Sequence, residues 1–431
     1  MSAQAHIFSK EYKTQHWKNS YFGVEFVFYL LQGLFLAGMT VYGTVRLAEW
    51  AIPLAQQATF AAITGFPAYV KLFIGLLTDR VIVGKWGRRK PYIMLGLIIT
   101  IPSYIFYITT DSYTGLLIAQ TLAFVSWAFV DTTLDALTVD ITPDEYDSRM
   151  QSYAQAGRYT GMAVGAFAVP FLGPIIGWKT IIMIVGLFGI LMPISALQIQ
   201  EGRITKEDLS GKMALGPMFK KAFTSKTTWL GILISIFMFG GITFSMVGNY
   251  VLTNFKWAAD PAKLQAYGIA SSLGLVGTIA GSMLMGRIYK TAGFKMKTIV
   301  IITIAFIVLT ASWFLFELNP ENVWLYSLCT FLRNIGNGMM IVTLYTVVMR
   351  VSTASIEGFM FAIMTSVMNI GQIIISPKTL GYTLPKVGIT ASLLILSVSV
   401  VVAVSLIGVL LKELETSQDV ETQPSFDAAT L

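Results

Sequence analysis

The sequence has little charge, little histidine and almost no cysteine, and each shortage excludes a class of protein. Only 12% of its 431 residues are Asp, Glu, Lys or Arg, whereas a soluble domain carries about 25%. Both histidines, His6 and His16, precede the first long apolar run, so no histidine can serve a metal site or proton relay within such runs. Cys329 is the only cysteine, which excludes an intramolecular disulfide. We therefore expect no enzyme, no cofactor and no metal.

Long apolar runs are what the chain has instead. Hydrophobic residues make up 55% of the sequence, and segments of about 20 apolar residues, each long enough to cross a bilayer as a helix, recur along it. The predicted fold class is an all-α polytopic membrane protein with twelve transmembrane helices. We expect these spans at residues 21–45, 54–79, 91–110, 114–139, 152–175, 179–199, 228–254, 266–288, 298–317, 322–349, 356–377 and 387–411.

The basic residues are distributed unevenly between the connections. Most of the 30 Lys and Arg residues fall in the N-terminal segment and in every second connection, and the positive-inside rule places that side in the cytoplasm. We therefore expect an integral protein of the plasma (inner) membrane with both termini cytoplasmic. Topology also explains the net charge of +7, so no nucleic-acid partner is expected. The few basic residues expected on the other side are Arg46, Lys179, Lys256, Lys263, Lys378 and Lys386.

The longest polar connection divides the spans six and six. It predicts a cytoplasmic N-terminal segment at 1–20, a six-helix bundle at 21–199, a linker at 200–227, a second bundle at 228–412 and a tail at 413–431. The tail is acidic, without a basic residue, and we expect it to be disordered. Within the linker, GPMFKKAF either lies along the membrane surface or is a solvated connection.

The two halves carry a weak repeat. After the second span the chain reads GLLTDRVIVGKWGRRK, and after the eighth it reads GRIYKTAGFKMK. Repetition between six-helix halves is typical of secondary transporters with two bundles and a solute site near the midplane.

The first of these segments resembles the signature loop between helices two and three of the major facilitator superfamily. The resemblance implies that the acid at Asp79 holds the halves together in the outward-open state, by facing a helix N-terminus and the loop arginines. The alternative is that the basic residues serve only as a topology signal. The motif positions are Gly75, Asp79, Arg80, Gly84, Gly87, Arg88, Arg89 and Lys90.

A narrower similarity rests on three stretches, which read PAYVKLFIGLLTDR, FVDTTLDALTVDITPDEYDSRMQSYAQAGRYTG and IEGFMFAIMTSVMNIG. Together they resemble the branch of folate–biopterin transporters, muropeptide permeases and acetyl-coenzyme A transporters. Members of this branch carry different solutes, so the resemblance names no cargo. The GRRKPYI piece is also similar to proton-coupled disaccharide transporters.

Three charged residues are expected deep within the spans. Lys71 precedes Asp79 by eight residues, and Asp131 and Asp135 share one helix face because they are four residues apart. Charges near the bilayer centre cost at least about 2.5 kcal/mol each, so they should face one another or a wet cavity. One aspartate is a candidate protonation site; the alternative is a static salt bridge between spans two and four.

Arg158 and Arg333 are the other cations within spans, one in each half. Arginine offers a planar fork of donors that suits a carboxylate or phosphate, which predicts a clamp for an anionic solute. The alternative for Arg333 is hydrogen bonding to neighbouring carbonyls. Other candidates to line the solute site are Glu25, which we expect to be solvated near the interface, Gln32, Asn337 and Asn369.

These features together predict a secondary active transporter of a small organic solute, working by alternating access. An anionic or polar metabolite is the favoured cargo, a proton is the candidate coupling ion, and we expect a monomer whose other partner is the lipid bilayer. One alternative is a proton-coupled sugar transporter. An alternative of another class is a membrane sensor or assembly factor that does not transport.

Overall fold

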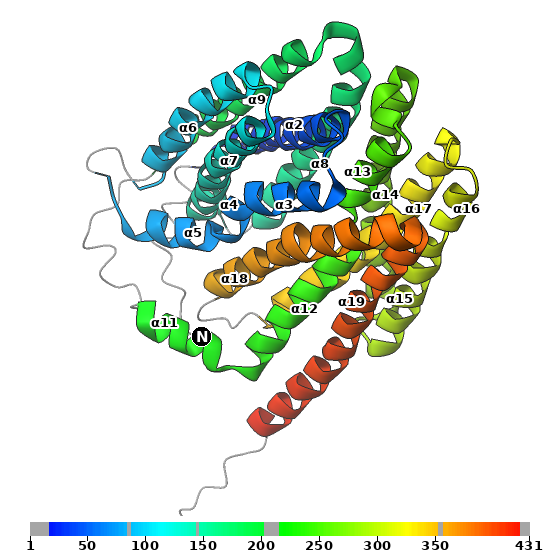
Figure 1. Cartoon of the computed structure of the whole chain (residues 1–431). Helices are drawn as coiled ribbons and strands as arrows, with labels where there is room; N and C mark the ends of the chain where they lie inside the picture. The colour runs from blue at the N-terminus through cyan, green and yellow to red at the C-terminus, as the bar shows by residue number, and fades with distance from the viewer. Residues whose placement is uncertain (1–16, 84–87, 144–145, 202–214, 352–356, 423–431) are drawn as a thin grey trace, which may run out of the picture.

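The computed structural model describes residues 17–83, 88–143, 146–201, 215–351 and 357–422. Within these ranges the secondary structure is helical, without strands. Long helices run alongside one another, with those of the N-terminal half in blue to teal and those of the C-terminal half in green to red (Figure 1).

The N-terminal half forms six spans. Five are single helices, and the second is broken into three short ones where Gly65 and Val70 interrupt it. Pro67 lies in the middle piece, where a missing backbone N–H favours an interruption. The helices are α2 (Ser20–Glu49), α3 (Leu54–Thr64), α4 (Phe66–Tyr69), α5 (Lys71–Arg80), α6 (Lys90–Thr109), α7 (Tyr113–Ile141), α8 (Asp147–Ile176) and α9 (Trp178–Ala196).

The C-terminal half forms six more spans after the short linker helix α11 (Leu215–Thr224). Its last two spans are separate helices that meet at Gly388, where φ is +80° and the backbone is not helical; the range of α19 below includes this turn. Its elements are α12 (Lys226–Ile242), α13 (Ser245–Asn254), η3 (Trp257–Ala259), α14 (Pro261–Ala292), α15 (Met296–Ala311), α16 (Trp313–Leu318), α17 (Val323–Val351), α18 (Glu357–Ile370), the π-helical η4 (Gly371–Ile375) and α19 (Ser376–Thr422).

Nine helical stretches of the described chain are long and apolar enough to cross a membrane. Three more spans bring the count to twelve. The stretch Ile363–Leu414 holds two spans, and the short helices α3 to α5 together form another. The third is α17, a long apolar helix that also contains Arg333. The twelve-helix prediction is therefore confirmed. One difference lies at the C-terminus: α19 is helical to Thr422, whereas the sequence predicts disorder from residue 413.

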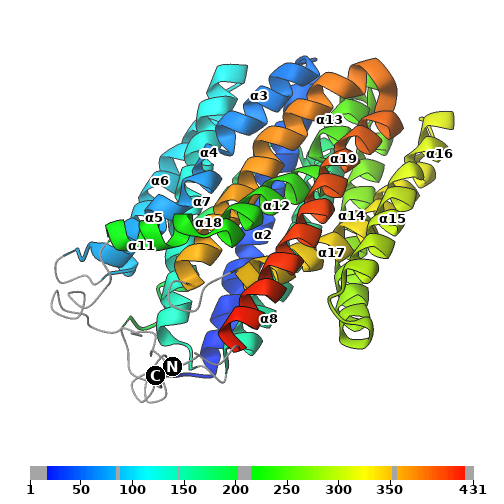
Figure 2. The ribbon, with the colours of Figure 1, turned by 90° about the horizontal axis from the view of Figure 1, so that it is seen from below.

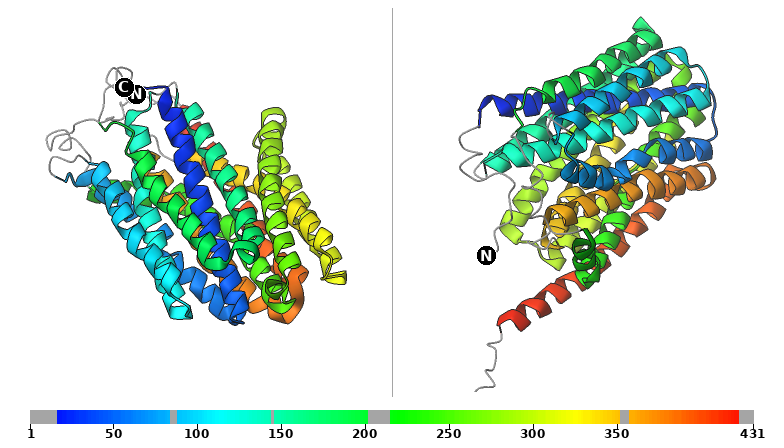
Figure 3. Two further views of the ribbon diagram at one scale, coloured as in Figure 1. Left: turned by 90° about the horizontal axis from the view of Figure 1, so that it is seen from above. Right: turned by 90° about the vertical axis from the view of Figure 1, so that its left-hand side faces the viewer.

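The start of α2 and the end of α19 lie at the same end of the bundle (Figures 2 and 3). We call this end the terminal face and the other end the opposite face. The halves meet where α8 packs against α14 and where α3 to α5 pack against α18, η4 and α19.

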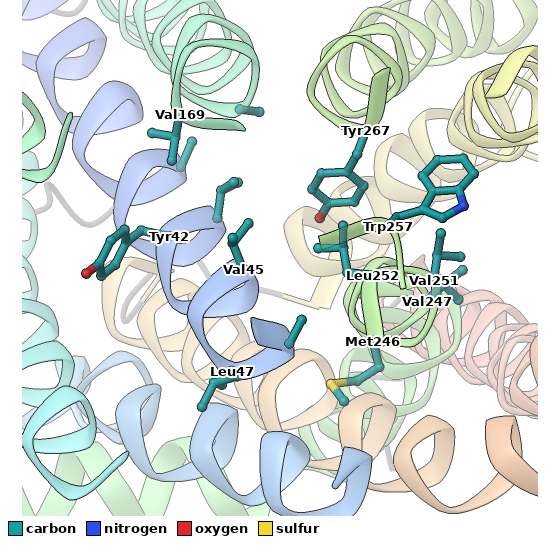
Figure 4. Packing of buried hydrophobic residues seen from close by; sticks show 14 of the residues in the cluster. Tyr42, Val45, Leu47, Val169, Met246, Val247, Val251, Leu252, Trp257 and Tyr267 are labelled. Atoms are coloured by element: carbon teal, nitrogen blue, oxygen red, sulfur yellow. The ribbon is translucent and has the colours of Figure 1, made fainter. Parts of the chain in front are cut away.

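The apolar core shows which face is closed. One cluster at the opposite face contains residues of both halves, including Val45 of α2 and Leu252 of α13. Figure 4 shows side chains of α2 and α8 beside those of α13 and α14 in this cluster. At the terminal face, by contrast, the halves have separate clusters, one around Met340 and one around Leu134. The halves therefore share one apolar core at the opposite face and have one core each towards the terminal face, where Leu72 of α5 still packs against the C-terminal cluster.

Amide and hydroxyl groups add a polar contact to this closure. Asn249 Nδ2 of α13 donates to Gln57 Oε1 of α3 over 2.7 Å, and Gln57 Nε2 donates to Thr253 Oγ1 over 3.2 Å. Thr44 of α2 lies 3.4 Å from Asn249 Oδ1. Gln57 is 1% exposed and Asn249 is 8% exposed, so these hydrogen bonds are shielded from water. We call these four residues the opposite-face latch.

Candidate functional site

Asp131 of α7 lies where α2, α5, α7 and α8 meet. It is 1% exposed, and its carboxylate accepts hydrogen bonds from Lys71 Nζ, Gln32 Nε2 and Arg158 Nη2, the last over 3.1 Å. Lys71 and Arg158 both form ion pairs with it. One buried carboxylate thus pairs with two cations, which lowers the cost of placing these charged residues within spans.

The break in the second span positions Lys71. Val70 ends the preceding helical turn, and Lys71 is the first residue of α5. A cation at a helix N-terminus is unfavourable because it opposes the helix dipole. Asp131 therefore offsets two costs of Lys71, the burial of its charge and its position at the start of α5. Lys71 Nζ also lies 4.4 Å from the ring centroid of Trp127, in the range of a cation–π contact.

Arg158 is held by α2. Its Nε donates to Gln32 Oε1 over 3.1 Å, and its guanidinium carbon lies 4.6 Å from the ring centroid of Tyr29. The two helices can approach this closely because residue 33 is a glycine. A Cβ at this position would lie only 2.3 Å from the Arg158 carbonyl oxygen. The Arg158 side chain is 28% exposed and that of Lys71 19%, so both cations remain open to a solute.

Asp135 lies one helical turn from Asp131 but does not join its ion pairs. Its carboxylate accepts a hydrogen bond from the Tyr29 hydroxyl, and the residue is exposed. One turn further along, Thr138 donates to Glu25 Oε2 over 3.1 Å. Glu25 is 1% exposed, so the expectation that it is solvated near the interface is wrong: α7 covers it.

Arg333 lies apart from this cluster, inside the C-terminal half. It is fully buried; its Nη1 donates to Thr310 Oγ1, and its Nη2 lies 3.4 Å from the carbonyl oxygens of Gly241 and Ile242. These carbonyls end α12, at the break before α13. The structure therefore does not bring Arg158 and Arg333 together as a clamp. Arg333 instead contacts neighbouring carbonyls, which was the alternative prediction for this residue.

Asn337 and Asn369 occupy different places. Asn337 Nδ2 donates to Asn334 Oδ1 over 3.3 Å within α17, and its own Oδ1 is buried without a partner among the described residues. Asn369 Nδ2 of α18 donates over 3.0 Å to the carbonyl oxygen of Ala68. That carbonyl belongs to α4, so Asn369 bonds to the interrupted second span across the two halves.

The signature loop is described in part. Positions 84 to 87, with Gly84 and Gly87, and the side chains of Asp79 and Arg80 lie outside the described residues. Arg88 and Arg89 are buried and both form ion pairs with Asp140 of α7.

The start of α6 in this loop is capped by an acid. Glu201 accepts hydrogen bonds from the backbone N–H groups of Arg88, Arg89 and Lys90, over 2.7, 2.6 and 3.0 Å. A carboxylate is favoured at a helix N-terminus, where several N–H groups have no helical partner. A Cβ added at Gly75 of α5 would be in ordinary van der Waals contact with Thr132 of α7. Asp140 and Glu201 tie the loop itself to the N-terminal half.

Several residues of these sites could not be singled out from the sequence alone. Tyr29, Thr138, Asp140, Glu201 and Trp127 are partners of predicted residues. Two signals were available: the spacing of 25, 29 and 32 and that of 131, 135 and 138 each follow one helix face. Which faces meet is a matter of tertiary packing.

Comparison with known proteins adds the family. Residues 28–376 match the family model of the Major Facilitator Superfamily. A search of curated proteins gave no match.

Solved structures share the fold at low sequence identity. A mutant of the nucleoside transporter NupG matches with a TM-score of 0.70 and 13% identity, over 90% of this chain and 98% of that one. An inward-facing, unoccupied bacterial homolog of the human lysosomal transporter Spinster matches with 0.67 and 15%, over 95% and 99%. A POT family transporter in complex with 5-aminolevulinic acid matches with 0.66 and 14%, over 91% and 96%.

Proposed function

Because the chain belongs to the Major Facilitator Superfamily, and is thus an integral membrane transporter, we propose that it couples a small anionic organic solute to a proton at the cluster around Asp131. The observation that carries this proposal is that one buried carboxylate holds two partly exposed cations, Lys71 and Arg158. A carboxylate or phosphate of a solute can replace Asp131 as their partner, because arginine binds such groups through its fork of donors.

Charge balance links this exchange to a proton. When a solute anion joins the site, it and the carboxylates of Asp131 and Asp135 make three negative charges against the two cations Lys71 and Arg158. Protonation of one aspartate removes the excess negative charge. Asp135, which is exposed one turn away, is suited to exchange that proton with water. The proton then moves with the solute, and its release restores the ion pairs of Asp131.

The state of the structure fits one step of alternating access. We place both termini in the cytoplasm of a plasma (inner) membrane protein, from the distribution of Lys and Arg. The face where the halves have separate apolar cores is then the inward face, and the opposite-face latch closes the outer side. Within the superfamily we keep the folate–biopterin, muropeptide and acetyl-coenzyme A branch as our proposal, and a monomer as the functional unit.

A thermal unfolding panel tests the solute class. Purified protein is heated with dicarboxylates, 5-aminolevulinic acid, sugar phosphates, nucleosides and disaccharides. We expect anions to raise the unfolding temperature of the wild type but not of Arg158→Gln. Lys226→Gln is the matched control, since it removes an exposed ion pair with Glu413 and should leave the response intact. A response to a disaccharide alone would overturn the anion proposal and favour the sugar alternative.

A further inference from the structure

Three side-chain hydrogen bonds join α2 to α7 in a regular register. Glu25 bonds to Thr138, Tyr29 to Asp135 and Gln32 to Asp131. The residue numbers rise along α2 by four and then three, and they fall along α7 by three and then four, as expected for two antiparallel helices in contact along one face. We call these three pairs the carboxyl ladder, because each contains one acid.

The ladder leads from the ion pairs towards the terminal face. Each step is one helical turn, about 5.4 Å, so Glu25 lies about two turns from Asp131. Asp131 at one end is paired with two cations. Glu25 at the other end is 1% exposed, and within the described ranges its hydrogen-bond partner is the hydroxyl of Thr138 and it has no ion pair.

This environment favours a neutral carboxyl group at Glu25. A buried carboxylate without a cationic partner costs several kcal/mol, which is why such groups take up a proton instead. The charged groups that face Glu25 are Asp135 and Asp131 on α7, which repel a negative charge there, and Arg158 on α8, which attracts one. Arg158 is already engaged by Asp131, and the neighbouring Tyr29 is occupied by Asp135.

We propose that Glu25 is a second proton-binding carboxyl group, which shares one proton with Asp135 during transport. The inference rests on the proposed proton coupling. In the step concerned, the carboxylic acid of Asp135 releases its proton and becomes a carboxylate, while the carboxylate of Glu25 takes up that proton and becomes the acid. The pair keeps one negative charge throughout, so Glu25 and Asp135 are never both charged. Exposed Asp135 exchanges with water, and buried Glu25 stores the proton.

Infrared spectroscopy of the full chain tests this without any solute. The protein is reconstituted in vesicles of phosphatidylethanolamine and phosphatidylglycerol, and the carboxylic acid C=O band is followed during a pH titration. We expect Glu25→Gln to remove one acid band and to move the loss of the Asp135 band to lower pH by about one unit, as for coupled sites. The shift is towards lower pH because Glu25→Gln removes a negative neighbour that favours the protonated form of Asp135.

Two further variants keep the test decisive. Glu49→Gln changes the same residue type at the exposed end of the same helix and should leave both bands unchanged. If Glu25→Gln does not fold, Thr138→Val retains Glu25 but removes its hydrogen bond, and the Glu25 C=O band should move to higher frequency. The inference is overturned if Glu25→Gln leaves the carboxylic acid bands unchanged. It is also overturned if Thr138→Val does not move the Glu25 C=O band. Proton-driven uptake, measured separately, tests the proposed function and can succeed while this inference fails.

Discussion

At the scale of single residues, Asp131 determines the charge balance of the site. Asp131→Asn leaves Lys71 and Arg158 without a carboxylate, and removing one partner of a buried ion pair costs about 3–5 kcal/mol. Lys71→Met added to it removes one of the two orphaned charges. We therefore predict that the double variant is more stable than the sum of the single losses implies.

Unfolding midpoints in detergent for the four proteins of this double-mutant cycle provide the measurement. Strictly additive losses would show that Lys71 and Asp131 do not interact in solution. Glu49→Gln, at the far end of α2, should change the midpoint by no more than a surface substitution does, within about 0.5 kcal/mol.

The sequence allowed some of the site to be predicted and not the rest. Depth along the helices suggested that Lys71 and Asp131 lie at one level, because rise per residue is fixed. The partners Tyr29 and Thr138 could not be chosen, since the register of α2 against α7 depends on side-chain packing. Glu25 was misplaced for the same reason: distance from the helix start indicates depth but not which helix covers a side chain.

At the scale of elements, breaks in two spans place the functional side chains. The turn at Val70 presents Lys71 to Asp131, and the end of α12 presents two carbonyls to Arg333. The apolar pattern predicted uninterrupted helices at both places, because an interruption of one turn barely changes hydropathy. Arg333 was grouped with Arg158 because both are cations within spans, and only the packing separates a helix cap from a solute ligand.

Arg333→Gln separates these two roles. Its loss leaves the carbonyls of Gly241 and Ile242 without a donor, at about 1–3 kcal/mol for each buried group left unsatisfied. We predict a lower unfolding temperature but an undiminished temperature rise on adding the best solute of the panel. Arg333→Lys, which keeps the charge but not the fork, should lie between. If Arg333→Gln instead has normal stability but no longer responds to the solute, Arg333 binds the solute directly.

At the scale of the whole molecule, the two halves form one apolar core at the opposite face and two at the terminal face. The twelve spans could be predicted because a bilayer dictates helix length and polarity. The conformational state could not, because the open and closed states have the same spans and differ only in which side chains of the two halves meet.

The latch residues Gln57 and Asn249 provide a test of that state. In a Cys329→Ser background, Gln57→Cys and Asn249→Cys are joined by a short, reducible thiol cross-linker. We predict that exchange of the best solute of the panel stops on cross-linking and resumes on reduction, because the opposite face must open in each cycle. Gln57→Cys alone, treated identically, should continue to exchange. Exchange that persists in the cross-linked protein would mean that these helices do not separate.

Uptake into proteoliposomes under an imposed pH gradient tests the central proposal of proton-coupled transport most directly. With an alkaline interior, we predict that the wild type accumulates the panel's best solute above its external concentration. Asp135→Asn should still exchange solute across the membrane but should not accumulate it, because it lacks the carboxyl group that exchanges the proton. Equal wild-type uptake with and without the gradient would contradict proton coupling.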